Sequence, residues 1–380
     1  MSQSAEHSFL INQDIWKTNS NNTTYPRQTY MNTFEKSLEN HEKSKTIIPR
    51  MSNHTVPIDL SVLKEESHNP VKHIKHKPFI CKYFTKICNI IGAGWLVSTK
   101  SNYQLDRSDV LWCVPDICGS ICAVITWMLI GYAAFVVIFV MVIPAPSFYF
   151  RWINGTAFAF LSLLAFLSHL KSMLTNPGTV SLGTATTENI QKICSDNKKT
   201  VYKCVKCNSI KPQRAHHCSI CQRCVNKMDH HCPWVNNCIG ENNQKYFVLF
   251  TFYICVISIY SIYISVHFFV MCVGSEWEDC KDGFSPAAST IFIVFLLVEG
   301  VLFGLFTAIM CGEQLQSIWM DETGIETLRK ERATWERKSK WVNMQSLFGY
   351  PPSWKWFCPL IEPNLQSFIL DSNTNSLHIV

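Results

Sequence analysis

Charged residues are scarce in this sequence of 380 residues: they make up only 16% of it, whereas a soluble domain typically has roughly 25%. Hydrophobic residues make up 47% and aromatic residues 13%. Charge is absent altogether from residues 117–143, a stretch long enough, at about 1.5 Å per residue, to cross a hydrocarbon layer of about 30 Å. This lack of charge argues against a purely soluble protein and favours a polytopic membrane protein with polar extensions.

Residues 1–66 lack helical or strand periodicity, and they also lack the charged start and apolar core of a signal peptide. They are polar and rich in Asn, Ser and Thr, so we expect a flexible segment. Residues 67–116 are expected to form a basic juxtamembrane segment, because no acidic residue interrupts the lysines between Lys72 and Lys86. Such a run favours contact with an anionic membrane face. Nucleic acid is the rival partner, but the adjacent aromatic residues favour lipid, and we predict no nucleic-acid partner.

Four apolar stretches are long enough to span a membrane as helices. They lie at Ile117–Ile143, Trp152–Leu170, Tyr246–Val273 and Ser289–Cys311. The predicted fold class is an all-α polytopic membrane protein with four transmembrane helices and a cytosolic, zinc-bound, cysteine-rich domain between helices 2 and 3. The predicted segments after residue 116 are helices 1 and 2 at 117–173, the cysteine-rich domain at 174–245, helices 3 and 4 at 246–311, a cytosolic C-terminal domain at 312–359 and a flexible tail at 360–380.

The connections between these stretches differ in charge. Residues 174–245 carry ten Lys and Arg against four Asp and Glu, whereas residues 274–288 carry only Lys281 against four acidic residues. Because cytosolic loops are enriched in Lys and Arg, we expect the cysteine-rich segment and, with four crossings, both termini to be cytosolic. The cytosol is reducing, so metal binding is favoured over disulfides for the cysteines of this segment.

Eleven cysteine and histidine residues crowd into residues 204–238. They are Cys204, Cys207, His216, His217, Cys218, Cys221, Cys224, His230, His231, Cys232 and Cys238. The Cys-x-x-Cys spacing, which lets two thiolates reach one zinc ion, occurs three times, and two tetrahedral sites would use eight of the eleven residues. We therefore predict two structural zinc ions. If both sites are Cys₃His, one cysteine is left over, and counting alone does not identify it.

The neighbours of Cys232 distinguish it from the other cysteines. Pro233 disfavours a helical conformation for the residue before it, and Trp234 favours the boundary between water and lipid. Asp229, His230 and His231 stand just before Cys232 and offer a carboxylate to orient an imidazole and an imidazole to accept a thiol proton. Cys232 is therefore a candidate nucleophile. Because adjacent residues do not share a face of a helix or strand, we expect this arrangement to require an irregular loop.

These residues, in the spacing Cys-x2-Cys-x9-His-Cys-x2-Cys-x2-Cys-x4-Asp-His-His-Cys-x5-Cys, resemble the cysteine-rich domain of the DHHC protein S-acyltransferases, or protein palmitoyltransferases. The resemblance implies one zinc ion held by Cys204, Cys207, His217 and Cys224 and a second held by Cys218, Cys221, His231 and Cys238. It implies that Cys232 is the acylated nucleophile, His230 its base and Asp229 the residue that orients His230. The implied activity moves a long-chain acyl group, expected to be palmitoyl, from acyl-CoA through acyl-Cys232 to cysteines of membrane-apposed proteins.

Three further segments resemble motifs of the same family. Thr323-Gly324-Ile325-Glu326 resembles its TTxE motif, with glycine in place of the second threonine. Asn176-Pro177-Gly178 resembles its DPG motif, with asparagine for aspartate, and Asn343 with Phe348-Gly349 resembles its C-terminal packing segment. The resemblance covers about residues 111–359. The TGIE variant and the basic stretch after it are most similar to the Golgi-associated members, so we expect a multi-pass protein of the Golgi membrane.

A long-chain acyl-CoA is expected to bind at the edge of the bilayer, because roughly fifteen CH₂ groups at ~0.8 kcal/mol each favour lipid by on the order of 12 kcal/mol. Its phosphates then need cations just outside the membrane, and its chain needs a slot among the helices. The predicted CoA and acyl contacts are Lys211, Arg214, His216, Arg329, Trp234, Phe247 and Phe250. The first four equally fit solvated surface charges.

Two other functions compete with acyl transfer. A zinc-stabilised membrane adaptor would hold two zinc ions and bind partners through its tails, but it would take up no acyl group. A transporter would use Glu299, an ionisable residue within the fourth apolar stretch. The simpler role for Glu299 is that of a protonated or hydrogen-bonded packing residue. Incubation with labelled acyl-CoA separates the three functions.

Overall fold

The computed structural model describes residues 55–57, 112–197, 201–275, 284–330 and 335–362, all within one compact unit. The basic run at 72–86 and most of the segments predicted to be flexible lie outside the described residues. Within them the protein is mostly helical, as the sequence predicts.

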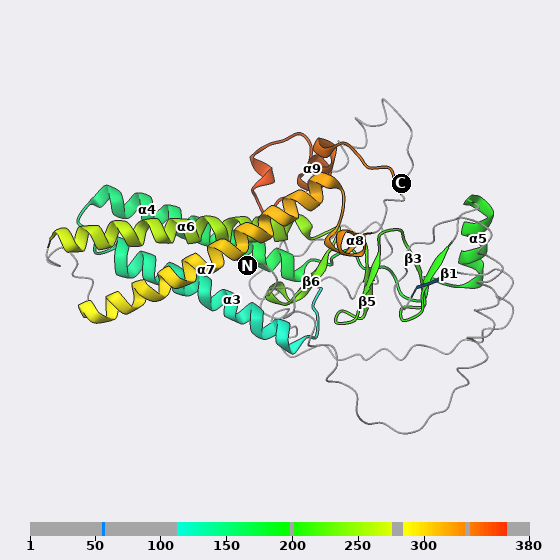
Figure 1. Ribbon diagram of the computed structural model, residues 1–380, viewed down its shortest axis with the longest axis horizontal. Helices are drawn as coiled ribbons and strands as arrows, with labels where there is room; N and C mark the ends of the chain where they lie inside the picture. The colour runs from blue at the N-terminus through cyan, green and yellow to red at the C-terminus, as the bar shows by residue number, and fades with distance from the viewer. Residues whose placement is uncertain (1–54, 58–111, 198–200, 276–283, 331–334, 363–380) are drawn as a thin grey trace, which may run out of the picture. The chain divides into compact units, whose positions relative to one another are not determined.

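Four long helical segments lie side by side (Figure 1). They are α3 (Ile117–Phe135) continued by the π-helix η3 (Val136–Val142), α4 (Phe148–Leu174), α6 (Gln244–Gly274) and α7 (Pro286–Met320). Each of the four is long and apolar enough to cross a membrane. The four predicted spans are therefore confirmed as helices, and the chain has the architecture of a multi-pass membrane protein.

Polar residues set the points where three of these helices begin. The Asp116 side chain accepts hydrogen bonds from the first backbone N–H groups of α3, and Ser147 and Ser285 do the same for α4 and α7. Such caps satisfy N–H groups that have no partner within the helix. Pro286, which has no N–H, occupies the first turn of α7, where none is needed.

Helix α7 is longer than predicted. It continues past Cys311, where the apolar stretch ends, to Met320, and Asp321 closes it in a left-handed conformation with φ of 52°. The added turns are amphipathic: Gln314 and Ile318 are buried, whereas the residues between them are largely exposed. Hydropathy marks only the lipid-facing part of such a helix, so it misses a polar extension that packs on the protein itself.

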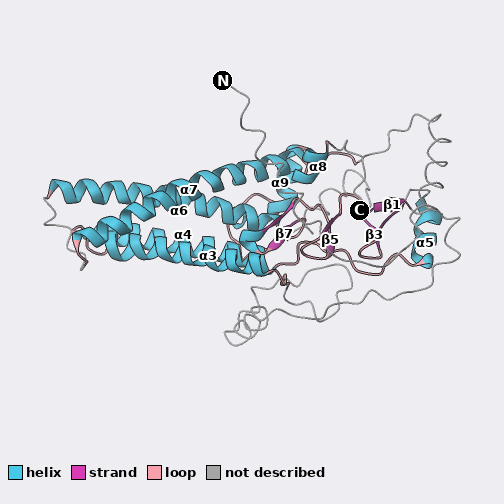
Figure 2. Cartoon of the chain, turned by 60° about the horizontal axis from the view of Figure 1, so that its bottom comes forward, coloured by secondary structure: helices cyan, strands magenta, loops and turns pink. Residues whose placement is uncertain are grey.

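Seven short strands, each of three residues, occur among the described residues, and most belong to the cysteine-rich segment (Figure 2). They are β1 (Thr55–Pro57), β2 (Tyr202–Cys204), β3 (Ser209–Lys211), β4 (His216–Cys218), β5 (Arg223–Val225), β6 (His230–Cys232) and β7 (Asn237–Ile239). They pair antiparallel as β1-β2-β3, β4-β5 and β6-β7. Strand β1 lies within residues 1–66, the segment that the sequence predicts to be flexible.

The remaining elements are shorter. They are α5 (Thr187–Asn197), η4 (Pro233–Val235), α8 (Gly324–Arg329), α9 (Lys340–Phe348) and η5 (Trp354–Trp356). The C-terminal residues pack on α6: Lys245 Nζ donates to the carbonyl of Ile361 at 2.9 Å, and the Tyr253 hydroxyl donates to the carbonyl of Phe357 at 2.5 Å. This segment is thereby fixed to the helix that follows the cysteine-rich segment.

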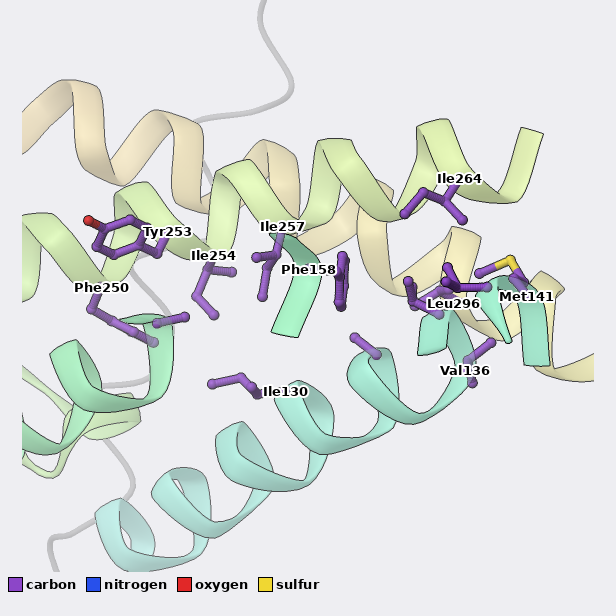
Figure 3. Close-up of a cluster of buried hydrophobic side chains, with 14 of the residues drawn as sticks. Ile130, Val136, Met141, Phe158, Phe250, Tyr253, Ile254, Ile257, Ile264 and Leu296 are labelled. Atoms are coloured by element: carbon purple, nitrogen blue, oxygen red, sulfur yellow. The ribbon is translucent and has the colours of Figure 1, made fainter. Parts of the chain in front are cut away.

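The main hydrophobic core lies between the long helices. Figure 3 shows Phe250, Ile254 and Ile257 in a row along α6, with Ile130 of α3 across from them. Small residues bring α6 and α7 close together, since a Cβ added to Gly304 would lie only 3.2 Å from the Cβ of Ser258. Close approach through small residues is typical of helix packing in membranes.

Candidate active site and metal centres

One group of cysteine and histidine side chains comes from β2, β4, β5 and the turn after β2. The Nδ1 atom of His217 lies 3.7 Å from Sγ of Cys204, 3.2 Å from Sγ of Cys207 and 3.9 Å from Sγ of Cys224. All four ligand atoms lie within 4.8 Å of one another.

A second group comes from β4, the turn after it, β6 and β7. The Nδ1 atom of His231 lies 3.7 Å from Sγ of Cys218, 3.4 Å from Sγ of Cys221 and 3.6 Å from Sγ of Cys238. The Sγ atoms of Cys221 and Cys238 are 3.4 Å apart. The two groups consist of the eight residues that the family resemblance implies as ligands.

Both groups fit zinc. With Zn–S of about 2.3 Å and Zn–N of about 2.0–2.1 Å, a regular tetrahedron has edges of about 3.6 Å from sulfur to nitrogen and about 3.8 Å from sulfur to sulfur. The observed distances of 3.2–3.9 Å lie around these values. Three thiolates and one imidazole are also a common donor set for structural zinc. Each group could therefore hold one zinc ion.

Strand pairing brings the ligands of each group together. In the β4-β5 pair His217 lies directly opposite Cys224, and in the β6-β7 pair His231 lies opposite Cys238. Side chains alternate across a strand, so Cys218 points away from its neighbour His217 and belongs to the other group. The alternation explains why adjacent residues serve different metal groups.

The same alternation separates Cys232 from the metal. His230, His231 and Cys232 form strand β6, so His230 and Cys232 share one face while His231 lies on the other with its metal group. The prediction of an irregular loop is wrong in this respect. That prediction considered adjacent residues. The two groups that react are the His230 imidazole and the Cys232 thiol, which are two positions apart and therefore lie on the same face of a strand.

A network of hydrogen bonds surrounds the buried carboxylate of Asp229. Its Oδ2 lies 2.7 Å from Nδ1 of His230 and accepts a hydrogen bond of 2.7 Å from Nε2 of Gln314, while its Oδ1 accepts from the backbone N–H of Gly324. A carboxylate is an acceptor only, so Nδ1 of His230 carries a hydrogen, which leaves Nε2 as the ring nitrogen available to take a proton.

The environment shifts the pKa values of both residues. Burial by itself would raise the pKa of Asp229, but the hydrogen bonds from His230, Gly324 and Gln314 outweigh it and hold the pKa below its ordinary value. Burial would lower the pKa of His230, yet the interactions with Asp229 and Cys232 raise it to about 9. Asp229 is therefore ionised, and it stabilises the protonated form of His230.

Cys232 also lines a cavity of about 770 Å³, open mouth included, between α3, α6 and α7. Trp234, Phe247 and Phe250 line the same cavity, and the Phe247 ring lies 5.4 Å from the His230 ring. The predicted nucleophile and the three predicted acyl contacts thus meet at one apolar space. Glu299 lies in its wall, and its buried Oε2 has no hydrogen-bond partner among the described residues.

Of the four residues predicted to bind the CoA phosphates, Arg214 is a cation with only 8% of its side chain exposed. It bonds to Asp321 at 2.6 Å and to Glu326 at 2.8 Å, and its guanidinium stacks 4.0 Å from the centre of the Trp335 ring. These contacts engage its guanidinium within the protein. Arg214 therefore ties the strand region to the segment after α7 rather than facing an open phosphate site.

The other three differ in exposure. His216 is buried, and burial, together with the charges of Lys211, Arg329 and Arg214, lowers the pKa of His216 to about 3, so the imidazole is neutral at physiological pH. Arg329 is exposed, and its Nη1 lies 3.4 Å from Nδ1 of His216. Lys211 is half-buried. Of the four residues, Arg329 is thus the most exposed.

The TGIE segment connects this network to the site. The Thr323 side chain and Glu326 form a capping box at the start of α8, and Glu326, only 1% exposed, accepts the hydrogen bond from Arg214. Gly324, which has no side chain, contacts Asp229 through its backbone N–H. The replacement of threonine by glycine therefore leaves a backbone contact to the candidate catalytic carboxylate intact.

Sequence reasoning missed two buried residues of the site. Gln314 was placed beyond the fourth apolar stretch, so nothing suggested that it would reach Asp229. His169 accepts a hydrogen bond of 3.0 Å from Trp127 at Nδ1, so its Nε2 donates to the carbonyl of Trp234 at 2.9 Å. A histidine inside an apolar stretch was the available signal for His169, because buried polar groups generally need partners.

Comparison with known proteins relates the whole arrangement to a family. A family model described as DHHC palmitoyltransferase matches residues 197–331. Over 264 residues the chain is 50% identical to palmitoyltransferase ZDHHC7 of Rattus norvegicus, which covers 70% of this chain and 85% of that protein. It is 51% identical over 261 residues to palmitoyltransferase ZDHHC3-A of Danio rerio (69% and 82%) and 50% identical over 254 residues to palmitoyltransferase ZDHHC3 of Homo sapiens (67% and 85%).

Proposed function

Because the chain belongs to the DHHC palmitoyltransferase family and is a protein S-acyltransferase, we propose that Cys232 carries the acyl group, with His230 as its base and Asp229 as the residue that orients His230. One observation carries the assignment. Of the seven cysteines between residues 204 and 238, Cys232 alone lies outside the two metal groups, and it lines the apolar cavity on the same strand face as His230.

The raised pKa of His230 supports its role as the base. An ordinary thiol has a pKa of about 8.5 and an ordinary imidazole about 6.5, so moving the proton from one to the other costs about 2.7 kcal/mol. Asp229 and Cys232 raise the pKa of His230 to about 9, which favours the imidazolium and so reduces this cost. The pair can then form a thiolate beside an imidazolium without a strong external base.

The proposed reaction has two steps. The Cys232 sulfur attacks the thioester carbonyl of a long-chain acyl-CoA, the carbon–sulfur bond to CoA breaks, and the CoA thiolate takes up the proton held on His230. A cysteine thiol of a membrane-apposed protein then gives its proton to His230, and its sulfur attacks the carbonyl carbon of acyl-Cys232. The bond between that carbon and the Cys232 sulfur breaks, and Cys232 leaves as the thiolate. Zinc ions in the two metal groups would supply rigidity, holding β4 to β7 in place around Cys232.

The cavity suits a chain of about sixteen carbons. Along α6 its wall runs from Phe247 to Ser261, fourteen residue steps, or about 21 Å at about 1.5 Å per residue. An extended alkyl chain advances about 1.25 Å per bond, given C–C bonds of about 1.52 Å and angles near 111°, so fifteen bonds reach about 19 Å. This match supports palmitoyl as the transferred group, with Trp234, Phe247 and Phe250 beside the end nearest Cys232.

The proposed membrane setting follows from charge and resemblance. Excess Lys and Arg in residues 174–245 supports a cytosolic active site and cytosolic termini. Lys211 and Arg329 are the proposed contacts of the CoA phosphates, whereas Arg214 and His216 shape that region from inside the protein. A Golgi location is proposed because the TGIE variant and the basic stretch after it resemble the Golgi-associated members of the family.

Incubation of the purified protein with labelled palmitoyl-CoA tests the assignment. Wild-type protein is expected to gain a hydroxylamine-sensitive label, and Cys232→Ser is expected to lose it while keeping both metal groups filled. Cys255→Ser is the matched control, because Cys255 lies on α6 outside the cavity wall and outside both metal groups. A label that persists in Cys232→Ser would move the nucleophile elsewhere, and a wild-type protein without label would favour the adaptor or transporter.

A further inference from the structure

We propose that Gln314 is a positioning residue for acyl transfer, acting through Asp229 to keep His230 aligned with Cys232. The proposal rests on the proposed function and adds to it a residue that lies far from the cysteine-rich segment in sequence. Gln314 belongs to the last turns of α7, whereas Asp229 directly precedes β6.

The contact between the two side chains is buried. Nε2 of Gln314 donates to Oδ2 of Asp229 at 2.7 Å, and only 3% of Gln314 and 6% of Asp229 is exposed. The same Oδ2 atom meets Nδ1 of His230 at 2.7 Å. The backbone N–H of Gly324 donates to the other oxygen, Oδ1, so that Oδ1 has one contact and Oδ2 has two. Gln314 therefore donates a hydrogen bond to the same carboxylate oxygen that orients the His230 imidazole.

The orientation of the Gln314 amide is itself fixed. Its Oε1 accepts a hydrogen bond of 3.2 Å from Nε2 of Gln244, at the start of α6. Because a carboxylate only accepts hydrogen bonds, the amide has to present its NH₂ group to Asp229 and its oxygen to Gln244. The chain Gln244, Gln314, Asp229, His230 thus runs from two membrane helices to the base of the reaction.

This arrangement gives the carboxylate a second anchor that does not depend on His230. When the imidazole turns to exchange a proton with Cys232, Gln314 and Gly324 keep Asp229 in place, so that the ring returns to the same position. Without the Gln314 donor, the only anchor of the carboxylate in the described part of the chain, besides His230, is the backbone N–H of Gly324 on the opposite oxygen. Small displacements of a reacting group can lower a rate by up to about a hundredfold. We therefore expect loss of the Gln314 donor to slow the reaction by disturbing the alignment of His230 with Cys232.

Gln314→Met tests the proposal, since methionine keeps the length of the side chain but has no donor. In a single-turnover assay with palmitoyl-CoA, we expect the rate of Cys232 labelling at saturating acyl-CoA to fall about 10- to 100-fold. The KM for palmitoyl-CoA and the content of two zinc ions should stay unchanged. Gln316→Met is the matched control, because Gln316 is exposed on the same helix two residues away, and it should label at the wild-type rate.

A double-mutant cycle separates positioning from a merely structural role. If Gln314 acts through Asp229, Gln314→Met should add no further loss of rate in an Asp229→Asn background. Gln244→Met, which removes only the group that orients the amide, should cause a smaller loss that likewise vanishes in that background. Two results would overturn the proposal: losses of rate that simply multiply in the double variants, or a Gln314→Met protein that labels at the wild-type rate. Neither result would affect the labelling of Cys232 in the wild-type protein, and hence the proposed function.

If Gln314→Met does not fold or loses zinc, the Gln244→Met cycle decides. Gln244 is half-buried, so its replacement disturbs the packing less. A folded Gln244→Met protein with two zinc ions and a slower labelling rate that depends on Asp229 supports the proposal. One that labels at the wild-type rate contradicts it. Absence of label in the wild-type protein would instead refute the function on which the proposal rests.

Discussion

Arg214→Met should destabilise the protein strongly, because it removes the cation from a buried cluster of opposite charges. The guanidinium bonds to Asp321 and Glu326, whose side chains are 15% and 1% exposed, and it stacks on Trp335. Methionine keeps much of the side-chain bulk but leaves both carboxylates without their partner. The desolvation of those carboxylates, rather than any lost surface charge, is the expected source of the damage.

Breaking one side of a buried ion pair typically costs about 3–5 kcal/mol. At about 2.1 cal/mol/K of unfolding entropy per residue, that loss corresponds for a chain of 380 residues to an unfolding temperature lower by roughly 4–6 °C. Arg337→Met is the matched control, because Arg337 pairs with Glu322 at 2.7 Å, but with 45% of its side chain exposed. An exposed pair contributes only about 0–1 kcal/mol, so this variant should unfold near the wild-type temperature.

The assay is thermal unfolding of the purified protein in detergent, combined with the KM for palmitoyl-CoA. A structural Arg214 predicts a lower unfolding temperature, partly restored by adding Glu326→Gln, which removes one of the unpaired charges. A phosphate-binding Arg214 predicts an unchanged unfolding temperature and a raised KM. The second outcome would refute the interpretation of the Arg214 contacts given above.

Four further predictions concern the site. Asp229→Asn should slow Cys232 labelling by two or more orders of magnitude, because asparagine lacks the charge that raises the pKa of His230 and offers one acceptor oxygen where the carboxylate offers two; a single-turnover rate near wild type would contradict this. Cys218→Ser should lower the zinc content by about one ion and destabilise the fold, whereas His216→Ala, outside both metal groups, should keep two ions by metal analysis. Leu296→Phe should shift the preference toward shorter acyl-CoA chains, because Leu296 lines the cavity on α7; an unchanged profile from twelve to twenty carbons would show that the chain does not reach it. Glu299→Leu should leave Cys232 labelling within about threefold of wild type, since a packing role needs no ionisable group, and abolished labelling would give Glu299 a part in the reaction.

The sequence predicted the parts of the molecule that depend on local spacing and composition. The four helices follow from long stretches without charge, and the two metal groups come together from the cysteines and histidines that the family resemblance implied. The two metal groups can be predicted because few residue types and few spacings satisfy a tetrahedral zinc site. Counting leaves one cysteine of the segment without a metal role, and the residues on either side of Cys232, together with the family resemblance, identify it as that cysteine.

The parts that depend on contacts between distant segments could not be predicted. The polar extension of α7 beyond Cys311 carries no hydropathy signal, so Gln314 was not connected to Asp229. Arginine is a residue type that commonly binds phosphate, so the sequence made Arg214 a candidate. Only its distances to Asp321 and Glu326 show that it forms ion pairs within the protein. Strand β6 was missed because three residues are too few for a periodicity, although that strand places His230 beside Cys232.

Native mass spectrometry of the protein after a single turnover with palmitoyl-CoA reports bound zinc and bound acyl groups on the same molecule. We expect two zinc ions with one hydroxylamine-sensitive acyl group in the wild-type protein, and two zinc ions without an acyl group in Cys232→Ser. A Cys232→Ser protein that has lost one zinc ion would show that this sulfur is a metal ligand rather than the nucleophile, and the account would be wrong.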